Sequence, residues 1–273
     1  MTDFIITFRE TLEAALVAGI VLSYLAHIEK KSWFSVVYWA IAAGVILSVA
    51  AGYAFETFLG GFQGKAEEIY EGVIMLLAAA LISWMILWMI KQRHKIKAHL
   101  QQTVDRHVET ENKIGVFILV FLAVLREGIE TVLFLQASAL QAGGNSVIAA
   151  ALGIVVAIAV GYILFSGLKK MPIQQFFTVT TIILILFAAG LVAHGIHELQ
   201  EAGWIPFLTQ QAWDLNPAVI TEGIYPLLHE NGAIGSLLKH VFGWNGNPSQ
   251  LEVLSYLLYL GVMAGVMRMA EKK

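Results

Sequence analysis

The motif R-E-x-x-E occurs twice in this chain, and both copies lie within apolar sequence. The first copy runs from Arg9 to Glu13 and the second from Arg126 to Glu130. A charged side chain inside a membrane span costs roughly 2.5–3.5 kcal/mol even on the lenient insertion scale, and such residues usually mark an ion or substrate pathway. Three charges in five residues, present twice, therefore predict a protein that moves a cation through a membrane.

The composition is that of an integral membrane protein. Apolar residues make up 58% of the chain and charged residues 14%, compared with roughly 25% charged residues in soluble domains. Long apolar stretches recur, each near the ~20 residues that a helix needs to cross a bilayer. The predicted fold is all-α, with seven transmembrane helices at residues 4–26, 34–55, 67–90, 114–140, 146–168, 175–197 and 251–269. We expect the first span to be a retained helix, because no basic leader or cleavage site accompanies it.

The basic residues predict the orientation of these spans. If seven spans alternate, 13 of the 17 Lys and Arg residues fall on one side of the membrane, and only Lys65 and Lys239 fall on the other. Cytoplasmic loops carry an excess of Lys and Arg. We therefore expect the N-terminus outside the cell and the C-terminus in the cytoplasm. The outer face is then acidic, which would concentrate cations there, although acidic residues also gather wherever the opposite side is basic.

The first three predicted spans match the next three in order. Arg9 corresponds to Arg126 at an offset of 117 residues, and Gly44 corresponds to Gly153 at an offset of 109. Three spans separate the copies, so the halves have opposite orientations, which is the inverted-repeat plan of many transporters. The predicted single membrane domain is divided into repeat one (1–90), a cytoplasmic loop (91–113), repeat two (114–197), an external cap (198–250), and a seventh span with a cytoplasmic tail (251–273).

The spacing within each motif places its acidic residues on one helix face. Residues three or four apart on a helix are neighbours, so Glu10 lies beside Glu13, Glu127 lies beside Glu130, and each arginine can pair with the second glutamate. If the two helices cross, four carboxylates can converge. Carboxylate oxygens suit hard cations and suit copper(I) poorly. Four Glu and two Arg carry a formal charge of −2, which a divalent ion would neutralise. The alternative is an ion-pair network that only joins two helices.

Two further clusters could bind cations near the predicted outer face. The first lies at the start of the third span and consists of Glu67, Glu68 and Glu71. It is either a first capture site for incoming ions or a solvated helix start that the helix dipole favours. The second cluster closes the sixth span and consists of His194, His197, Glu198 and Glu201. Its spacing is compatible with a secondary metal site, and the alternative is hydrogen bonding between packed helices.

Aromatic residues lie near several predicted span ends. Together they predict an interfacial belt at the membrane surface, formed by Trp33, Trp39, Trp88, Trp204 and Tyr256. The methionines of the segment W-M-I-L-W-M lack a partnering array of Met or Cys residues. We therefore expect them to pack or face lipid and not to bind copper.

The doubled motif resembles the oxidase-dependent high-affinity iron permease family, found in fungi and in bacterial iron-uptake systems of the Efe type. The resemblance covers nearly the whole chain and includes F-R-E-T-L-E-A-A-L, W-M-I-L-W-M, R-E-G-I-E-T-V-L-F and H-E-L-Q-E-A-G. It implies that iron passes the motif glutamates Glu10, Glu13, Glu127 and Glu130, with Arg9 and Arg126 as charge partners. It also implies an external protein that oxidises or delivers iron. The chain departs from the family at Thr11, where Gly is more common.

We therefore predict a permease and not an enzyme. It would be a multi-pass protein of the cytoplasmic membrane that moves iron, ferric or ferrous, into the cell, with no permanent cofactor and no nucleic-acid partner. The motif G-x-x-x-x-G-K-[ST] is missing, so the energy source would be a gradient, the membrane potential or a partner protein. The rivals are a carrier for manganese or lead on the same scaffold, and an intramembrane metal-dependent enzyme built on His194 and His197.

Overall fold

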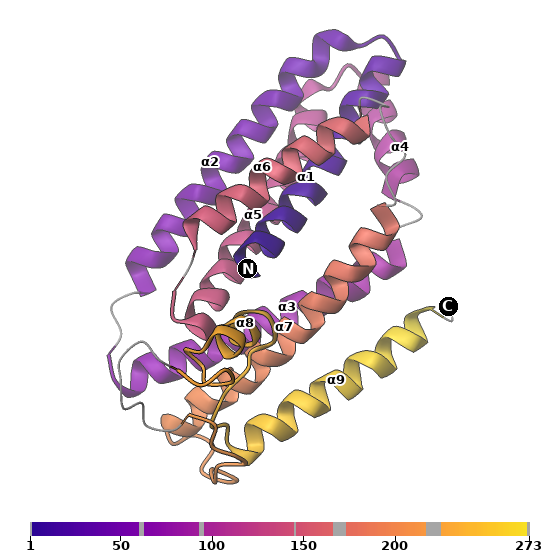
Figure 1. Cartoon of the computed structure of the whole chain (residues 1–273). Helices are drawn as coiled ribbons and strands as arrows, with labels where there is room; N and C mark the ends of the chain where they lie inside the picture. Colours follow the sequence, from indigo (N-terminus) through magenta and orange to yellow (C-terminus); the bar gives the residue numbers. More distant parts are fainter. Residues whose placement is uncertain are drawn as a thin grey trace.

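Figure 1 shows the computed structural model of the chain, which describes residues 2–59, 63–92, 96–144, 146–165, 173–216 and 225–271. This part of the chain is helical and contains no β-strand, although one antiparallel bridge joins Gln211 to Ser249. The all-α prediction is therefore confirmed. The predicted spans coincide with the long helices α1 (Thr2–His27), α2 (Phe34–Leu59), α3 (Lys65–Gln92), α5 (Lys113–Ala142), α6 (Val147–Phe165), α7 (Ile173–Glu201) and α9 (Gln250–Glu271).

Shorter helices occupy the connections. The 3-10 helix η1 (Lys31–Trp33) precedes α2, α4 (Ile96–Glu109) lies in the predicted cytoplasmic loop, and α8 (Ala233–Phe242) lies in the predicted cap. The Tyr24 hydroxyl of α1 donates a hydrogen bond to Asp105 of α4. Trp33, which we expected in the interfacial belt, is instead buried in the core, with the Lys113 ammonium 5.9 Å from the centre of its ring.

Some predicted features lie outside the described residues. They are the end of the fifth span at 166–168, the middle of the cap at 217–224, and part of the basic residues that predict the orientation, namely Arg93, Lys95, Lys169, Lys170, Lys272 and Lys273.

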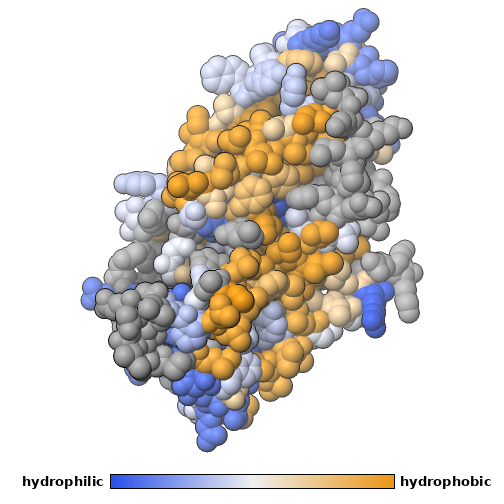
Figure 2. Space-filling view, in the orientation of Figure 1, coloured by the Kyte–Doolittle hydropathy of each residue, from blue (hydrophilic) through white to orange (hydrophobic). Residues whose placement is uncertain are grey.

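Five helical segments in the described residues are long and apolar enough to cross a membrane, namely Lys31–Phe55, Lys65–Ile90, Val147–Phe165, Thr178–Glu201 and Gln250–Met269. The surface of the molecule has the corresponding character, because Figure 2 shows a broad hydrophobic band with hydrophilic residues gathered towards both ends. Large exposed apolar surfaces of this kind face lipid. Helices α1 and α5 are as long, with 26 and 30 residues, but they contain the charged motifs. The protein is therefore an α-helical membrane protein, while the count of seven spans stays a prediction.

The long helices pack in pairs drawn from different halves of the chain. Helix α1 lies along α6, α2 lies along α5, and α3 lies along α7. Under the predicted repeat, α1 corresponds to α5 and α6 corresponds to α2. The pair α1–α6 therefore corresponds to the pair α5–α2. Helix α3 corresponds to α7, so the repeat maps the pair α3–α7 onto itself.

Glycines at equivalent positions allow these close approaches. A Cβ atom added at Gly44 of α2 would lie 2.9 Å from Cγ1 of Val124 in α5, and one added at Gly153 of α6 would lie 2.1 Å from Oγ1 of Thr7 in α1. Gly44 corresponds to Gly153 at the offset of 109, and Thr7 corresponds to Val124 at the offset of 117. The two contacts are therefore the same contact in the two halves.

The equivalence continues two turns further along the helices. A Cβ atom at Gly52 would lie 3.1 Å from Val132, and one at Gly161 would lie 3.2 Å from Ala15. These four residues are related by the same two offsets. Two sets of matching contacts therefore agree with a repeat of the two halves, and the inversion of these halves across the membrane stays a prediction.

The departure at Thr11 has a counterpart on the facing helix. In the second half, Gly128 packs so closely on Ser48 that an added Cβ atom would lie 2.0 Å from the serine hydroxyl. The offsets place Thr11 at the position of Gly128 and Ala157 at the position of Ser48. The first half thus has the larger residue on the motif helix, and its partner position, Ala157, lacks the hydroxyl group that approaches Gly128 in the second half.

We expect Gly153→Ala to loosen the contact between α1 and α6. The new methyl group would lie 2.5 Å from the backbone oxygen of Phe4, and no side-chain rotation can relieve that clash. Overpacking of this kind costs about 1–3 kcal/mol, so the melting temperature of the purified protein in detergent should fall. Gly261→Ala in α9 is the matched control, because nothing lies within 4 Å of its added Cβ atom. Equal melting temperatures for the two variants would contradict the described packing.

Candidate functional site

The two motif helices bring their acidic residues together inside the bundle. Carboxylate oxygens of Glu10 on α1 and of Glu127 and Glu130 on α5 lie within 4.8 Å of one another. Glu127 lies about 21 Å from the start of α5 and about 22 Å from its end, at a rise of 1.5 Å per residue. The cluster is therefore near the middle of the helix bundle and far from both ends.

Each arginine pairs with both glutamates of its own motif. In the first motif, Arg9 Nη1 lies 3.1 Å from Glu10 Oε1, and Arg9 Nη2 lies 2.9 Å from Glu13 Oε1. The second motif repeats the pattern, with 2.7 and 3.3 Å between its arginine and the Oε1 atoms of its first and second glutamates. The pairing expected from the helical spacing is therefore present in both copies.

Three of the four carboxylates keep one buried oxygen that has neither a hydrogen bond nor an ion pair among the described residues. These buried atoms are the Oε2 oxygens of Glu10, Glu127 and Glu130, which are the residues that converge. Glu13 pairs with Arg9 but lies outside this group of three. An unpartnered buried carboxylate is costly. Because two arginines balance only two of the four acids, a proton or a metal cation would relieve the remaining negative charge.

The two arginines have different surroundings. The side chain of Arg9 is 0% exposed, and its Nη1 donates to the sulfur of Met85 at 2.8 Å and its Nη2 to the sulfur of Met89 at 3.7 Å. The side chain of Arg126 is 44% exposed and lies 4.8 Å from the centre of the Trp88 ring, a cation–π contact. Both arginines thus rest on the W-M-I-L-W-M segment of α3. The packing predicted for these methionines agrees with the burial of Met85 in a core cluster, whereas the predicted aromatic belt did not include the contact of Trp88 with Arg126.

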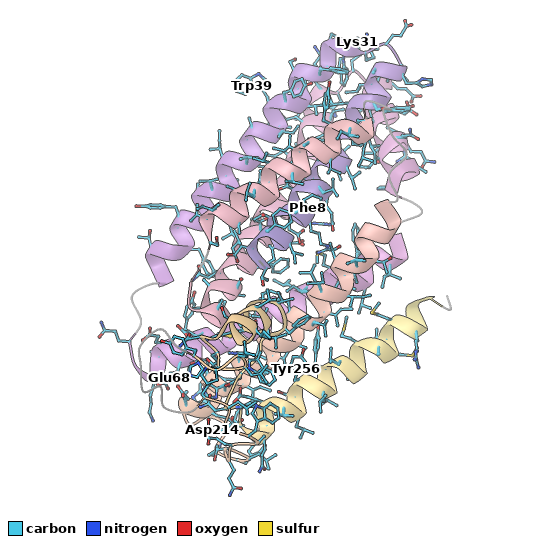
Figure 3. All side chains as sticks on the ribbon, in the orientation of Figure 1. Phe8, Lys31, Trp39, Glu68, Asp214 and Tyr256 are labelled. Atoms are coloured by element: carbon cyan, nitrogen blue, oxygen red, sulfur yellow. The ribbon has the colours of Figure 1, made fainter. Side chains whose placement is uncertain are left out.

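The two clusters that we predicted near the outer face lie at one end of the molecule. We call Glu67, Glu68 and Glu71, in the first two turns of α3, the outer acidic cluster. Helices α3 and α7 run antiparallel, so the start of α3 meets the end of α7, which carries the His194–Glu201 cluster. The charges of Glu68 and Glu71 act on the carboxylate of Glu198. Figure 3 labels Glu68 at this end and Lys31 at the opposite one.

His197 is held by two acids. Its Nδ1 lies 2.9 Å from Oε1 of Glu252, and its Nε2 lies 3.3 Å from Oε1 of Glu201. Glu252 is buried at the start of α9 and also accepts hydrogen bonds from the Ser249 backbone and the Asn245 side chain. Glu252 was not among the predicted site residues, and its one signal in the sequence is an acid at the start of an apolar helix. These contacts favour a structural role for His197 in joining α7 to α9.

A second missed acid lies near the start of α1. Asp3 is buried and accepts hydrogen bonds from the Ser138 hydroxyl at 2.8 Å and from the Ser146 backbone NH at 2.7 Å. It therefore joins α1 to α5 and to the beginning of α6. No pattern in the sequence distinguished it, because its partners are more than a hundred residues away.

A helical membrane protein with a buried, negatively charged carboxylate cluster has the features of a cation transporter. The chain belongs to the iron permease FTR1 family, which it matches over residues 1–271. Membership implies iron uptake across the membrane and confirms the resemblance found from the doubled motif.

Individual relatives are similar over most of their length. The chain is 33% identical over 260 residues to the ferrous iron permease EfeU of Yersinia pestis, which covers 94% of this chain and 89% of that protein. It is 31% identical over 260 residues to the ferrous iron permease EfeU of Escherichia coli O6:H1, with 94% and 91% covered. No solved structure matches the chain significantly. These relatives are named permeases and not enzymes.

Proposed function

We propose that iron crosses the membrane through the carboxylate cluster of the two motifs. Glu10, Glu127 and Glu130 would bind the ion directly, Glu13 would assist at the edge of the cluster, and the two arginines would balance charge. The observation that carries this proposal is the set of three buried carboxylate oxygens that lack a partner, one from each of the converging residues. Hard oxygen ligands suit iron, and the excess negative charge would attract a cation.

Ferrous iron is the substrate that we propose. The six motif side chains have a formal charge of −2, which a ferrous ion neutralises and a ferric ion exceeds. The relatives from Yersinia pestis and Escherichia coli are named ferrous iron permeases. Manganese is the main competitor, because it favours the same oxygen ligands. An external protein that oxidises or delivers iron belongs to this proposal on the strength of the family resemblance.

The proposed topology has seven spans in two inverted repeats plus a final helix. The boundaries are 1–90 and 114–197 for the repeats, 91–113 for the cytoplasmic loop, 198–250 for the external cap and 251–273 for the last span and tail. The equivalent glycine contacts support this division. Helices α1 and α5 count as spans because the carboxylates of their motifs lie inside the bundle, where each pairs with the arginine of its own motif. The positive-inside rule favours an external N-terminus in the cytoplasmic membrane.

The outer acidic cluster would capture iron before it reaches the motif carboxylates. Glu67 is exposed, Glu68 and Glu71 are partly buried, and all three lie far from the motif along α3. Acidic residues at the mouth of a pathway raise the local concentration of cations. They need not form part of the crossing point itself.

We expect Glu130→Gln to abolish transport while the protein still folds. The substitution keeps the shape of the side chain and removes one charge from the cluster, so the maximal rate of ferrous iron uptake into reconstituted vesicles should fall by at least about tenfold. Glu109→Gln, on the exposed end of α4, is the control and should transport normally. The ion-pair alternative predicts instead that a double variant with Arg9→Gln and Glu13→Gln recovers uptake. Normal transport by that double variant would contradict the proposed transport site.

The triple variant Glu67→Gln, Glu68→Gln, Glu71→Gln should affect iron capture and not the maximal rate, in contrast to Glu130→Gln. Because a capture site raises local concentration, its loss should increase the iron concentration needed for half-maximal uptake and leave the maximal rate nearly unchanged. Uptake measured against ferrous iron concentration separates the two effects. A loss of maximal rate as large as that of Glu130→Gln would place the outer acidic cluster within the transport site itself.

The topology can be checked by labelling, since the chain has no cysteine of its own. Cysteines introduced at Glu109 in α4 and at Ala212 in the cap would both be exposed. A membrane-impermeant thiol reagent added to intact cells should label Ala212→Cys and leave Glu109→Cys unmodified until the membrane is opened. Labelling of both positions from the same side would overturn the proposed orientation.

A further inference from the structure

A polar cavity of ≈ 580 Å³ lies at the end of the molecule where α7 meets the cap segment. Its walls come from α5, α7, α8 and the segment before α9. They include Gln141, His194, Glu198, Glu230 and Lys239. The outer acidic cluster lies beside this cavity, because Glu198 interacts electrostatically with Glu68 and Glu71.

Gln141 of α5 provides an oxygen with no partner. Its side chain is 2% exposed, and its Nε2 donates a hydrogen bond to the backbone oxygen of Lys239 at 3.1 Å. This bond holds the amide group in place. The other amide atom, Oε1, is buried and accepts no hydrogen bond from the described residues. Burying an amide oxygen without a partner is unfavourable. A cation bound in the cavity would remove that cost, because amide oxygens are good ligands for hard cations.

His194 provides a nitrogen in the state that binds metals. Its Nδ1 lies 3.1 Å from the backbone oxygen of Gly190. A carbonyl can only accept a hydrogen bond, so Nδ1 carries the proton and the lone pair of the neutral ring is on Nε2. Metal-binding histidines are commonly fixed in this way by a backbone carbonyl. Glu198 follows one turn later on the same helix face and adds a carboxylate to the same cavity.

Lys239, which lines the cavity, is neutralised by a fixed partner. Lys239 Nζ lies 3.1 Å from Oε2 of Glu230. Burial would raise the pKa of Glu230, but the backbone NH of Gly246, the amide of Asn216 and the ammonium of Lys239 outweigh it, so that pKa lies below its usual value. Glu230 therefore stays ionised near neutral pH and pairs with Lys239. Lys239 is therefore not available as a partner for the Glu198 carboxylate.

We propose that this cavity is a receiving site for a ferrous ion, with Gln141 Oε1, His194 Nε2 and the Glu198 carboxylate as its ligands. Mixed nitrogen and oxygen ligands suit ferrous iron. This set of ligands differs from the predicted cluster of His194, His197, Glu198 and Glu201. His197 is paired with Glu201 and Glu252, and Gln141 is a ligand that the prediction did not include. This proposal rests on the proposed function in one respect, namely that iron enters at this end of the molecule.

The receiving site is separate from the motif carboxylates. Gln141 and Glu130 are eleven residues apart on α5, which corresponds to about 16 Å along the helix. Between them lies Phe134, which is fully buried in a core cluster with Ile6 and Phe187. A chain can therefore hold two ions at once, one on each side of this apolar layer.

Ferrous ion binding to the full chain in detergent, measured without oxygen by equilibrium dialysis, tests the proposal. The unmodified chain should bind two ferrous ions, and Gln141→Leu should weaken one of them by at least about tenfold. Gln141→Glu is the discriminating variant, because it keeps Oε1 and loses the donor to Lys239. A ligand role predicts that Gln141→Glu binds as tightly as the unmodified chain or more tightly, whereas a structural role predicts the same loss as in Gln141→Leu. Gln211→Leu, at the exposed rim, is the control and should bind both ions.

Glu130→Gln keeps the two proposals distinguishable. It should retain the ion of the receiving site and lose the ion of the motif carboxylates. If Gln141→Leu binds two ions with unchanged affinity, or if Gln141→Glu fails as Gln141→Leu does, the receiving site is overturned and the transport site is unaffected. If Glu130→Gln transports normally, the proposed transport site fails while the ion lost in Gln141→Leu still identifies the receiving site.

Discussion

Unbalanced negative charge in the middle of an apolar helix bundle is the constraint on which the rest of this structure depends. Each arginine binds one oxygen of both glutamates in its motif, and the facing oxygens of three glutamates are left over. The bundle must therefore shield these charges from lipid and still leave room for a cation. Helix α3 contributes to the shielding with the sulfurs of Met85 and Met89 and the ring of Trp88, which contact the arginines without adding formal charge.

The exchange of partners between the two halves brings the motifs face to face. Helix α1 is held along α6 and also contacts α5, and α5 is held along α2. Glycines at equivalent places allow the backbones to approach, as at Gly44 and Gly153. Small residues serve this purpose in membranes because packing, and not the hydrophobic effect, associates helices there. The carboxylates converge because both motif helices occupy the centre of this arrangement.

Local features of the structure were predictable from the sequence, and the choice of distant partners was not. The helix positions follow from the long apolar stretches. The pairing of Arg9 with Glu13 follows from their spacing, because residues four apart are neighbours on a helix. The exclusion of Glu13 from the group of converging acids depends on how α1 crosses α5, which no local spacing contains. The partnership of His197 with Glu252 depends likewise on the packing of α9 against α7. Trp88 looked like an aromatic anchor because its contact with Arg126 joins two helices that are remote in sequence.

The exchanged packing also has a consequence for how the chain is assembled. Helices enter the membrane in the order of synthesis, and the chief partner of α1 is α6, which ends at Phe165. Arg9 can therefore meet Met85 and Met89 once α3 is made, but Glu10 lacks Glu127 and Glu130 beside it until α5 is complete, when more than half of the chain has been made. Neither half contains the partners that its own helices need. Two fragments cut between α3 and α5 would have to find each other in the bilayer before either could become a stable bundle.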